Sequence, residues 1–377
     1  MSSLAHERAF HAEGRPPRVG LIGPLPPPAG GMATQCEQLH QLLQAEGIDV
    51  VLVRSNAPYR PRWIGGIRGV RAVFRLVPYV YAIFNLCYRI DVIHLFANSG
   101  WSWHLFAAPA VWIARARRVP VIVNYRGGDA ERFLQGASWW VARTLRLADA
   151  CVVPSEFLQG VLSRFGVRSR IIPNVVDLSR FRPRESAPRT AGPHVIVTRN
   201  LEAIYDIETA IRAFALVVRR FPDTRLTIAG EGPERARLTA VAAELGLAGH
   251  VRFCGRLARD AMAALYRDAD VMLNPSRIDN MPNSILEAYA SGVPVVSTDV
   301  GGIPYIARGG VTALLVAPGE PSEMADGICR VLLDPELARS LTTHALSEVT
   351  RYSWSEVRPA WLQLYRILTG HAEAILG

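Results

Sequence analysis

Two carboxylates stand eight positions apart in the segment 275–302, which reads PSRIDNMPNSILEAYASGVPVVSTDVGG. Asp279 lies in a polar loop, and Glu287 lies on the short amphipathic run that follows, which we expect to be helical. An apolar strand at 293–297 and a glycine pair at 301–302 complete the segment. A loop, a helix, a strand and a glycine turn in this order place polar groups at the carboxyl ends of the strands of an α/β sheet, where ligands bind. We therefore expect both carboxylates to face one ligand.

A second pair of glycines lies near the N-terminus. Gly30 and Gly31 follow a proline-rich loop and precede a helical pattern that begins at Met32. Without a side chain, glycine lets the backbone approach a diphosphate at the N-terminus of a helix, where N–H groups favour anions. By itself the pair favours an ordinary tight turn. Together with the segment 275–302 it indicates a phosphate-binding loop.

Two polar residues of the first half accompany apolar runs. Arg126, in the sequence YRGGD, cannot act as a general base at neutral pH. Its guanidinium could stabilise a departing phosphate or bind an anionic acceptor. His94, in the sequence VIHLF, is interpreted as a buried structural histidine.

Asp268 and Asp270 are spaced as in some metal-binding carboxylate pairs, but they belong to an internal repeat. Residues 148–155 (ADACVVPS) and 269–276 (ADVMLNPS) share an Ala-Asp pair, a four-residue apolar run and a Pro-Ser pair. Asp149 has the same place in the first copy, so we interpret these aspartates as part of a strand-and-loop unit. No other cluster has the spacing of metal ligands, and we expect neither a metal nor another cofactor.

Short apolar runs suited to buried parallel strands alternate with helical patterns on both sides of each repeat. The expected strands are 19–22, 50–53, 92–95, 121–124 and 151–153 in the first half, and 195–198, 226–229, 251–254, 271–273 and 295–297 in the second. We therefore expect an α/β protein of two doubly wound, Rossmann-like domains facing a central cleft. The domains would be joined between Asp177 and Pro193, where proline and arginine crowd together.

The composition fits a folded chain of two domains. Half of the 377 residues are hydrophobic, which argues against long disorder. The five cysteines form no CxxC pair, which argues against a zinc site and favours a reducing compartment. The first fifteen residues lack the apolar core of a signal peptide, so we expect a cytoplasmic protein. All 42 basic residues are arginine, so each cationic phosphate contact would be made by a guanidinium fork.

The net charge of +9 is unevenly distributed. Residues 54–89 carry seven arginines, no acidic residue and several aromatic residues. Arg68, Arg71 and Arg75 recur at helical spacing, which is typical of an interfacial helix on an anionic membrane. The same spacing fits a solvated helix face above a core face, and the sequence does not decide between the two. Residues 92–114 are uncharged but interrupted by polar residues, which indicates a strand, a turn and a core helix rather than a membrane span.

The segment 275–302 resembles the donor-sugar signature of the retaining glycosyltransferases of family 4, which have the GT-B fold. In that family a carboxylate, seven intervening residues and a glutamate hold the sugar and the ribose of a nucleotide sugar. The resemblance implies that Glu287 binds the ribose and that Asp279, where the family usually has Glu, positions the sugar. The donor site would also include Asn280, Met281, Pro282, Asn283, Ser284 and Ile285.

Arg199 extends the resemblance, because it matches the family's arginine that grips the donor diphosphate. The lysine that the family has a few residues later is missing, and Ile204 and Tyr205 occupy that neighbourhood. Arg256 or Arg277 could take its place.

The resemblance covers nearly the whole chain and assigns its parts. Residues 1–178 would form the acceptor domain, with Arg126 where many relatives have histidine and with Gly30 and Gly31 in the family's N-terminal glycine loop. Residues 190–353 would form the donor domain. A helix within 354–377 would cross back onto the first domain. The stretch IIPNVVD before the linker matches the family and is expected to be structural.

The resemblance implies a hexosyltransferase-type enzyme that uses a UDP- or GDP-sugar and a lipid-linked glycan acceptor, with retention, in polysaccharide or glycoconjugate biosynthesis. Asp279, Glu287 and Arg126 would act at the reaction centre without a metal. A nucleotide-sugar epimerase or hydrolase of the same architecture, and an inactive scaffold in a polysaccharide complex, remain alternatives. Nucleic acid is not an expected partner, because aromatics at base-stacking spacing within a known module are absent from the sequence.

Overall fold

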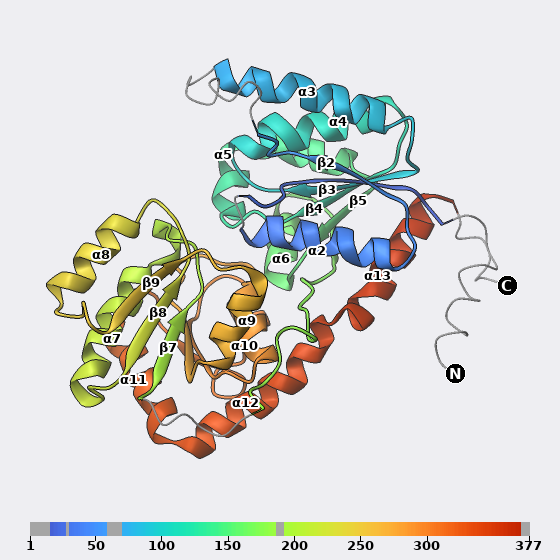
Figure 1. The fold of residues 1–377 in the computed structure, drawn as a ribbon. Coiled ribbons are helices and arrows are strands. Elements are labelled where there is room, and N and C mark those ends of the chain that lie inside the picture. The colour runs from blue at the N-terminus through green and yellow to red at the C-terminus, as the bar shows by residue number, and fades with distance from the viewer. Residues whose placement is uncertain (1–15, 28–29, 59–69, 186–191, 371–377) are drawn as a thin grey trace, which may run out of the picture. The chain divides into compact units, whose positions relative to one another are not determined.

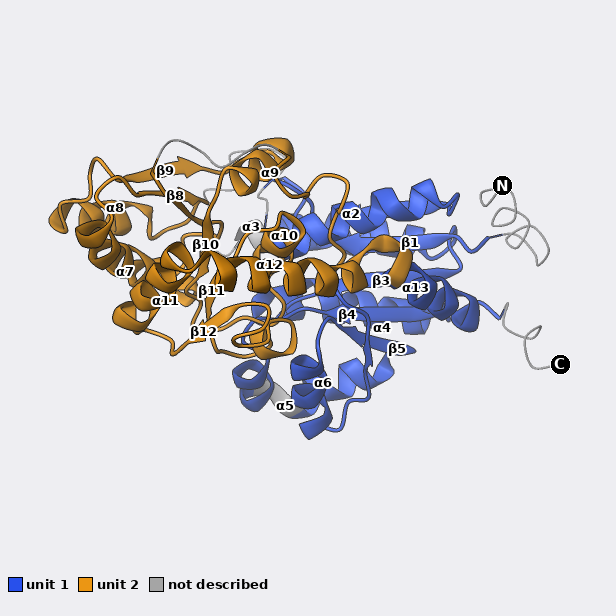
Figure 2. Ribbon diagram, turned by 90° about the horizontal axis from the view of Figure 1, so that it is seen from below, with its two compact units in different colours: residues 1–173, 357–377 blue, residues 174–356 orange. Residues whose placement is uncertain are grey.

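The computed structural model describes residues 16–27, 30–58, 70–185 and 192–370. Contacts divide the chain into two compact units, which Figure 2 colours separately. Unit 1 comprises residues 1–173 and 357–377, and unit 2 comprises residues 174–356. Each unit is built on one six-stranded parallel sheet with helices packed against it.

The sheet of unit 1 has the strand order β2-β1-β3-β4-β5-β6. Its strands are β1 (Val19–Gly23), β2 (Val50–Arg54), β3 (Val92–Ala97), β4 (Val121–Tyr125), β5 (Ala150–Val153) and β6 (Arg170–Ile171). Its helices are α2 (Gly31–Ala45), α3 (Val70–Leu86), the π-helix η2 (Trp103–Ala107), α4 (Ala108–Ala116), α5 (Ala130–Leu147), α6 (Glu156–Arg164) and α13 (Trp354–Leu368). Figure 1 shows α3 and α4 on one face of the sheet and α2 on the opposite face.

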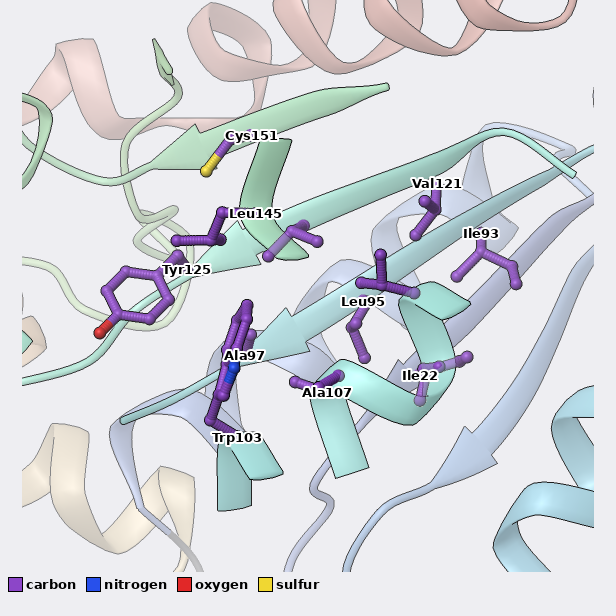
Figure 3. Packing of buried hydrophobic residues seen from close by; sticks show 14 of the residues in the cluster. Ile22, Ile93, Leu95, Ala97, Trp103, Ala107, Val121, Tyr125, Leu145 and Cys151 are labelled. Atoms are coloured by element: carbon purple, nitrogen blue, oxygen red, sulfur yellow. The ribbon is translucent and has the colours of Figure 1, made fainter. Parts of the chain in front are cut away.

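Successive side chains of the central strand β3 point to opposite faces of the sheet. Ile93 and Leu95 enter the apolar cluster beneath α3 and α4, where Trp103 is fully buried (Figure 3). His94, between them, is also fully buried but lies on the other face, where its ring is 4.5 Å from that of Trp361 on α13. The sheet thus separates an apolar layer from a layer that contains buried polar groups.

The sheet of unit 2 has the order β12-β11-β10-β7-β8-β9. Its strands are β7 (His194–Val197), β8 (Arg225–Ala229), β9 (Val251–Gly255), β10 (Val271–Asn274), β11 (Val295–Thr298) and β12 (Leu314–Val316). Its helices are α7 (Ile207–Arg220), α8 (Arg235–Glu244), α9 (Arg259–Arg267), α10 (Asn283–Ala290), α11 (Pro321–Leu333) and α12 (Pro335–Val349). Neighbouring residues of β10 again enter different clusters: Val271 packs with residues of α7 and α11, and Met272 packs with residues of α9 and α10.

The repeated aspartates secure the beginnings of strands. Asp149 precedes β5, and its carboxylate accepts a hydrogen bond of 2.9 Å from the N–H of Val121 on the neighbouring strand β4. Asp270 precedes β10 and accepts one of 2.7 Å from the N–H of His194 on β7. Asp268 is engaged in a salt bridge. Within the described ranges, no group of three or more His, Cys, Asp or Glu residues could hold a metal ion.

Every strand predicted from an apolar run is present, but two edge strands were not predicted. β6 and β12 have only two and three residues, too few for an alternating pattern to be recognised in the sequence. The helical pattern predicted for 354–376 forms α13 over Trp354–Leu368, and its last residues lie outside the described part of the chain.

The cationic face that the arginine spacing suggested for α3 stays a prediction, because one of its three arginines has a described side chain. Arg75 is half-buried, while Arg68 and the side chain of Arg71 lie outside the described part of the structure. The described exposed positions of α3 are mainly apolar and aromatic, among them Val77 and Tyr81. None of the helices, over the residues described, is long and apolar enough to cross a membrane.

Candidate functional site

The carboxyl ends of β7 and β10 meet where the strand order of unit 2 reverses. From β7 the chain proceeds to β8 and β9 on one side, then returns to β10, β11 and β12 on the other. Loops that leave neighbouring strands at such a point diverge and make room for a ligand. Arg199 follows β7, and Asp279 lies in the loop after β10. The topology therefore brings together two side chains that are 80 positions apart in the sequence.

Arg199 and Asp279 form an ion pair in which Nη2 of the arginine donates to Oδ2 of the carboxylate. The two side chains are nearly buried, with exposed fractions of 11% and 12%. The ring of Tyr205 covers the guanidinium, whose Cζ lies 4.0 Å from the ring centroid. Burial is the largest effect on the pKa of Arg199 and lowers it, but Asp279 together with Tyr205, Tyr266 and Glu202 outweighs burial and holds that pKa above its usual value. Nε of Arg199 is buried with no partner among the described groups, so one N–H is left for a ligand.

Asp279 is also oriented by its own loop. Its Oδ1 accepts a hydrogen bond of 2.9 Å from the N–H of Asn280. The hydroxyl of Ser276 lies 3.4 Å from Oδ2 and 3.0 Å from Oδ1 of Asn274. The sequence assigned Asp279 to the sugar and Arg199 to the diphosphate, and the structure shows that the two side chains also bind each other.

Glycines shape both loops that carry this ion pair. Gly301, at φ +56°, and Gly302 pack on the backbone of residues 279–280, where added Cβ atoms would lie 2.2 Å and 1.8 Å from carbonyl oxygens. Gly230, after β8, packs in the same way 1.9 Å from the carbonyl oxygen of Arg199. A side chain at any of these positions would displace the loop backbone. The glycines at 301–302 were predicted from the sequence, whereas Gly230 was not, although the sequence GEGP after an apolar run was a signal for it.

Glu287 lies in the second turn of α10 and is partly buried. Burial raises the pKa of its carboxyl to about 7, although a hydrogen bond with Tyr266 acts in the opposite direction. The hydroxyl of Tyr266, on α9, is 2.6 Å from Oγ1 of Thr198 and 3.1 Å from the carbonyl oxygen of Ser284. Tyr266 therefore connects Glu287 and α10 to the residue that precedes Arg199. This role could not be predicted from the sequence, because a tyrosine within a helical pattern is interpreted as a core residue.

The beginning of α10 is fixed by a distant residue of the same unit. The side-chain amide of Asn174 donates to the carbonyl oxygen of Met281 at 3.0 Å and to Oδ1 of Asn283 at 2.7 Å. The side chains of Met281 and Ile285 are buried in the core, and the assignment of these two residues to donor binding stays a prediction. Oγ of Ser284 is buried without a partner among the described residues, in the first turn where N–H groups are also left over.

Tyr205 lies in the region where the family has its lysine. It contributes an aromatic ring that packs on Arg199 instead of a second positive charge. Of the two arginines proposed as replacements, Arg277 is paired with Asp206 at 2.8 Å, and Arg256 is exposed after β9. Arg199 is therefore a nearly buried cation at this edge of the sheet. That Arg256 or Arg277 takes over the role of the family's lysine stays a prediction.

In unit 1 a chain of hydrogen bonds runs from Arg126 into the interior. Nε of Arg126 donates to Oδ1 of Asn124 at 2.9 Å, and the amide of Asn124 donates to Nε2 of His94 at 2.9 Å. Nδ1 of His94 therefore carries the ring proton and faces the hydroxyl of Tyr365 on α13 at 2.7 Å. Burial lowers the pKa of His94 to about 3 and that of Arg126 to about 9, so the histidine is neutral and the arginine charged at neutral pH.

Gly30 and Gly31 stand where the sequence placed them, at the start of α2. Gly30 is the N-cap residue with an extended backbone, and its carbonyl oxygen accepts the N–H of Thr34 at 2.9 Å. Helix N-termini of this form favour phosphate groups. The assignment of the two glycines to a diphosphate stays a prediction.

Two sheets of Rossmann type, with polar side chains at a strand-order reversal, define a two-domain enzyme of the nucleotide-binding α/β class. Comparison with known proteins identifies the family. A model described as "Glycosyltransferase Family 4" matches residues 29–180, and one described as "Glycosyl transferases group 1" matches residues 192–334. Between them they match a large part of each unit, and the chain belongs to glycosyltransferase family 4.

The relatives with curated names are named as glycosyltransferases or as a glycogen synthase. D-inositol 3-phosphate glycosyltransferase of Corynebacterium jeikeium is 26% identical, over 91% of this chain and 93% of that protein. The protein of the same name from Actinosynnema mirum is 32% identical, over 60% of this chain and 58% of that protein. Glycogen synthase of Mycobacterium tuberculosis is 25% identical, over 89% of this chain and 91% of that protein. The protein is accordingly a glycosyltransferase that transfers a sugar from a nucleotide sugar.

Solved structures show the same fold. Sucrose-phosphate synthase from Thermosynechococcus elongatus matches with a TM-score of 0.75 at 23% identity, covering 95% of this chain and all (100%) of that chain. Anabaena HepE in complex with UDP-glucose matches with a TM-score of 0.72 at 17% identity, covering 92% of this chain and 98% of that chain. The fold is GT-B, as the sequence predicted.

Proposed function

We propose that this glycosyltransferase transfers a hexose from a UDP- or GDP-sugar to a lipid-linked glycan, with retention of anomeric configuration, in polysaccharide or glycoconjugate biosynthesis. The nearly buried Arg199–Asp279 pair at the strand-order reversal of unit 2 is the observation that carries the donor assignment. The fold relative HepE was solved with UDP-glucose, which supports a uridine nucleotide as the first donor to test. A lipid-linked acceptor would place the enzyme at the cytoplasmic face of a membrane, in peripheral contact through residues 54–89.

In unit 2, the two carboxylates have different tasks in the proposed mechanism. Glu287 accepts hydrogen bonds from the ribose hydroxyls of the donor. Asp279 uses its remaining lone pairs to hold hydroxyls of the transferred sugar, while Arg199 and Asn280 fix its orientation. Because both carboxylates are positioned before the donor arrives, little reorganisation is needed at the reaction centre.

The leaving diphosphate gains negative charge as the bond to the sugar breaks. Arg199 offers a fixed positive charge and the unpartnered N–H at Nε, and the first turn of α10 offers N–H groups and the hydroxyl of Ser284. These groups offset the developing charge without a metal. We assign Arg126 of unit 1 to an anionic part of the substrates, either the departing phosphate or an anionic acceptor. Retention would follow from attack by the acceptor on the face that the diphosphate leaves.

A thermal-shift screen of UDP-, GDP- and ADP-sugars, followed by a transfer assay, tests the proposed function. A donor at a hundred-fold excess over its dissociation constant adds about 3 kcal/mol to the free energy of unfolding, so the correct nucleotide should raise Tm clearly. Absence of a shift with any nucleotide sugar would favour the inactive scaffold. Release of free sugar at the same rate with and without acceptor would favour a hydrolase.

We expect transfer to be independent of divalent metal ions. The two aspartates that resemble a metal-binding pair are occupied by the protein: Asp268 binds Arg225 at 2.6 Å, and Asp270 binds the N–H of His194. Adding EDTA should therefore leave the transfer rate unchanged, with a metal-dependent transferase assayed in parallel as the control. Loss of activity in EDTA that manganese or magnesium restores would contradict the proposed mechanism.

A further inference from the structure

α3 carries apolar side chains on two opposite sides. Tyr79, Ile83 and Leu86 are buried in the core of unit 1. A second row recurs every three or four residues along the other side and continues into the turn after the helix. Its side chains are between 41% and 69% exposed: Phe74, Val77, Tyr81 and Phe84 on α3, and Tyr88 in the turn. A helix that packs on a sheet normally presents polar residues to water. The contacts among the described residues of unit 1 therefore leave this exposed row unexplained.

The neighbouring helix α4 also exposes a large aromatic side chain. α3 and α4 lie side by side on one face of the sheet (Figure 1), and Trp112 of α4 is 45% exposed. Arg117, just after α4, lies over the rings of Phe84 and Tyr88, with its Cζ 4.8 Å and 4.1 Å from their centroids. We call the exposed row of α3 together with Trp112 the α3–α4 face. This face combines exposed apolar and aromatic side chains with the arginine that packs on two of them, and exposed apolar surface of this kind marks interaction sites.

The surroundings of the α3–α4 face are cationic. Neither α3 nor α4 contains an acidic residue, and Asp91 is the one acid between Asp49 and Asp129. Arg89 and Arg118 are exposed just beyond the ends of the two helices. A partner complementary to this face would combine negatively charged groups with apolar groups.

We infer that the α3–α4 face docks on an anionic lipid bilayer, with its apolar and aromatic side chains at the acyl boundary and its arginines among the lipid phosphates. Tyrosine and tryptophan are enriched at this depth of a membrane, and interfacial helices combine an apolar row with cations. A second copy of the chain is a poorer partner, because a symmetric contact would place arginines against arginines with no acid to offset them. The inference rests on the proposed function in one respect, since a lipid-linked acceptor requires unit 1 to reach a membrane.

Vesicle cosedimentation tests this docking with the full chain. The probes are vesicles of phosphatidylcholine alone and of an equal mixture with phosphatidylglycerol. We expect the wild type to partition at least about ten-fold more strongly onto the anionic vesicles, and to be released as salt screens the charges. Val77→Ser with Tyr81→Ser removes two of the most exposed apolar side chains of α3, and should lower this partitioning by about ten-fold. Tyr305→Ser, which removes a tyrosine 51% exposed on unit 2, is the matched control and should change nothing.

Three results would overturn the inference: no anionic-vesicle binding by the wild type, equal binding by the double variant, or a wild-type dimer that the double variant dissociates. The rise in Tm with nucleotide sugar, measured on the same proteins, separates this failure from failure of the proposed function. If that rise persists while vesicle binding fails, only the membrane docking is wrong. If no nucleotide sugar raises Tm, the donor function fails whatever the vesicles show.

Discussion

Replacing Asp279 with asparagine should destabilise unit 2 and abolish transfer in one step. Arg199 would keep its charge in a nearly buried position while losing its counter-charge. Breaking such a pair on one side costs about 3 kcal/mol or more, so the free energy of unfolding should fall by that amount. Urea unfolding of the variant and a transfer assay with the identified donor measure the two effects.

A double variant separates stability from chemistry. Arg199→Met with Asp279→Asn removes both charges, while the asparagine oxygen can still accept the N–H of Asn280. We expect this variant to regain most of the lost stability, because no uncompensated charge is left. It should remain inactive, because the diphosphate has lost its cation and the sugar its carboxylate. Wild-type transfer by either variant would remove Asp279 from the proposed site.

Glu287→Gln should lower transfer by about ten-fold or more and should change the pH dependence of donor binding. The Glu287 carboxyl has a pKa of about 7, so it is protonated below that pH and ionised above it. Ribose hydroxyls donate best to the ionised form, so the affinity of the wild type for its donor should rise as pH increases through about 7 and then level off. Glutamine does not titrate, and the variant should show no such step. Isothermal titration at several pH values measures this, and a flat wild-type profile would contradict the ribose assignment.

The free energy of unfolding provides the control for this variant, because we expect the substitution to raise stability while it lowers transfer. Burial raises the pKa of Glu287 from 4.5 to about 7, so the folded state holds this proton more tightly than the unfolded state does. The wild type therefore loses stability as pH rises from about 4.5 to about 7, as a buried group is forced to ionise. Glu287→Gln should match the wild type at low pH and exceed its stability above pH 7. Weak transfer in a more stable protein cannot be ascribed to misfolding.

The sequence could place each candidate residue on its own loop or helix, but it could not pair them. The spacing of Asp279 and Glu287 within one segment was visible directly. The pairing of Asp279 with Arg199 depends on β7 and β10 being neighbours, although β8 and β9 separate them in the chain. Parallel strands are not joined by a short hairpin turn, so the order of apolar runs in the sequence does not show which strands are neighbours in the sheet. The same limit concealed the contact of Asn174 with the start of α10.

The orientation of α3 was hidden for a different reason. Its periodicity correctly predicted a helix. Because the helix has apolar residues on two sides, the sequence alone could not show which side packs on the sheet. Tyr79 and Tyr81 are equally plausible core residues in the sequence, yet one is 4% exposed and the other 69%. The arginines were visible in the sequence, whereas the exposed aromatic row required the fold. Tyr266 and Gly230 escaped notice because their roles are contacts with other elements rather than local patterns.

The position of α13 has a consequence for the order in which the protein folds on the ribosome. Unit 1 contains both the first strands to be synthesised and, through residues 357–377, the last helix. Until α13 emerges, His94 lacks the hydroxyl of Tyr365 and the ring of Trp361 that packs on it. Unit 2 is continuous in the chain and can fold while translation proceeds. Unit 1 is therefore completed only after all of unit 2 has been synthesised, which reverses the usual vectorial order of domain folding.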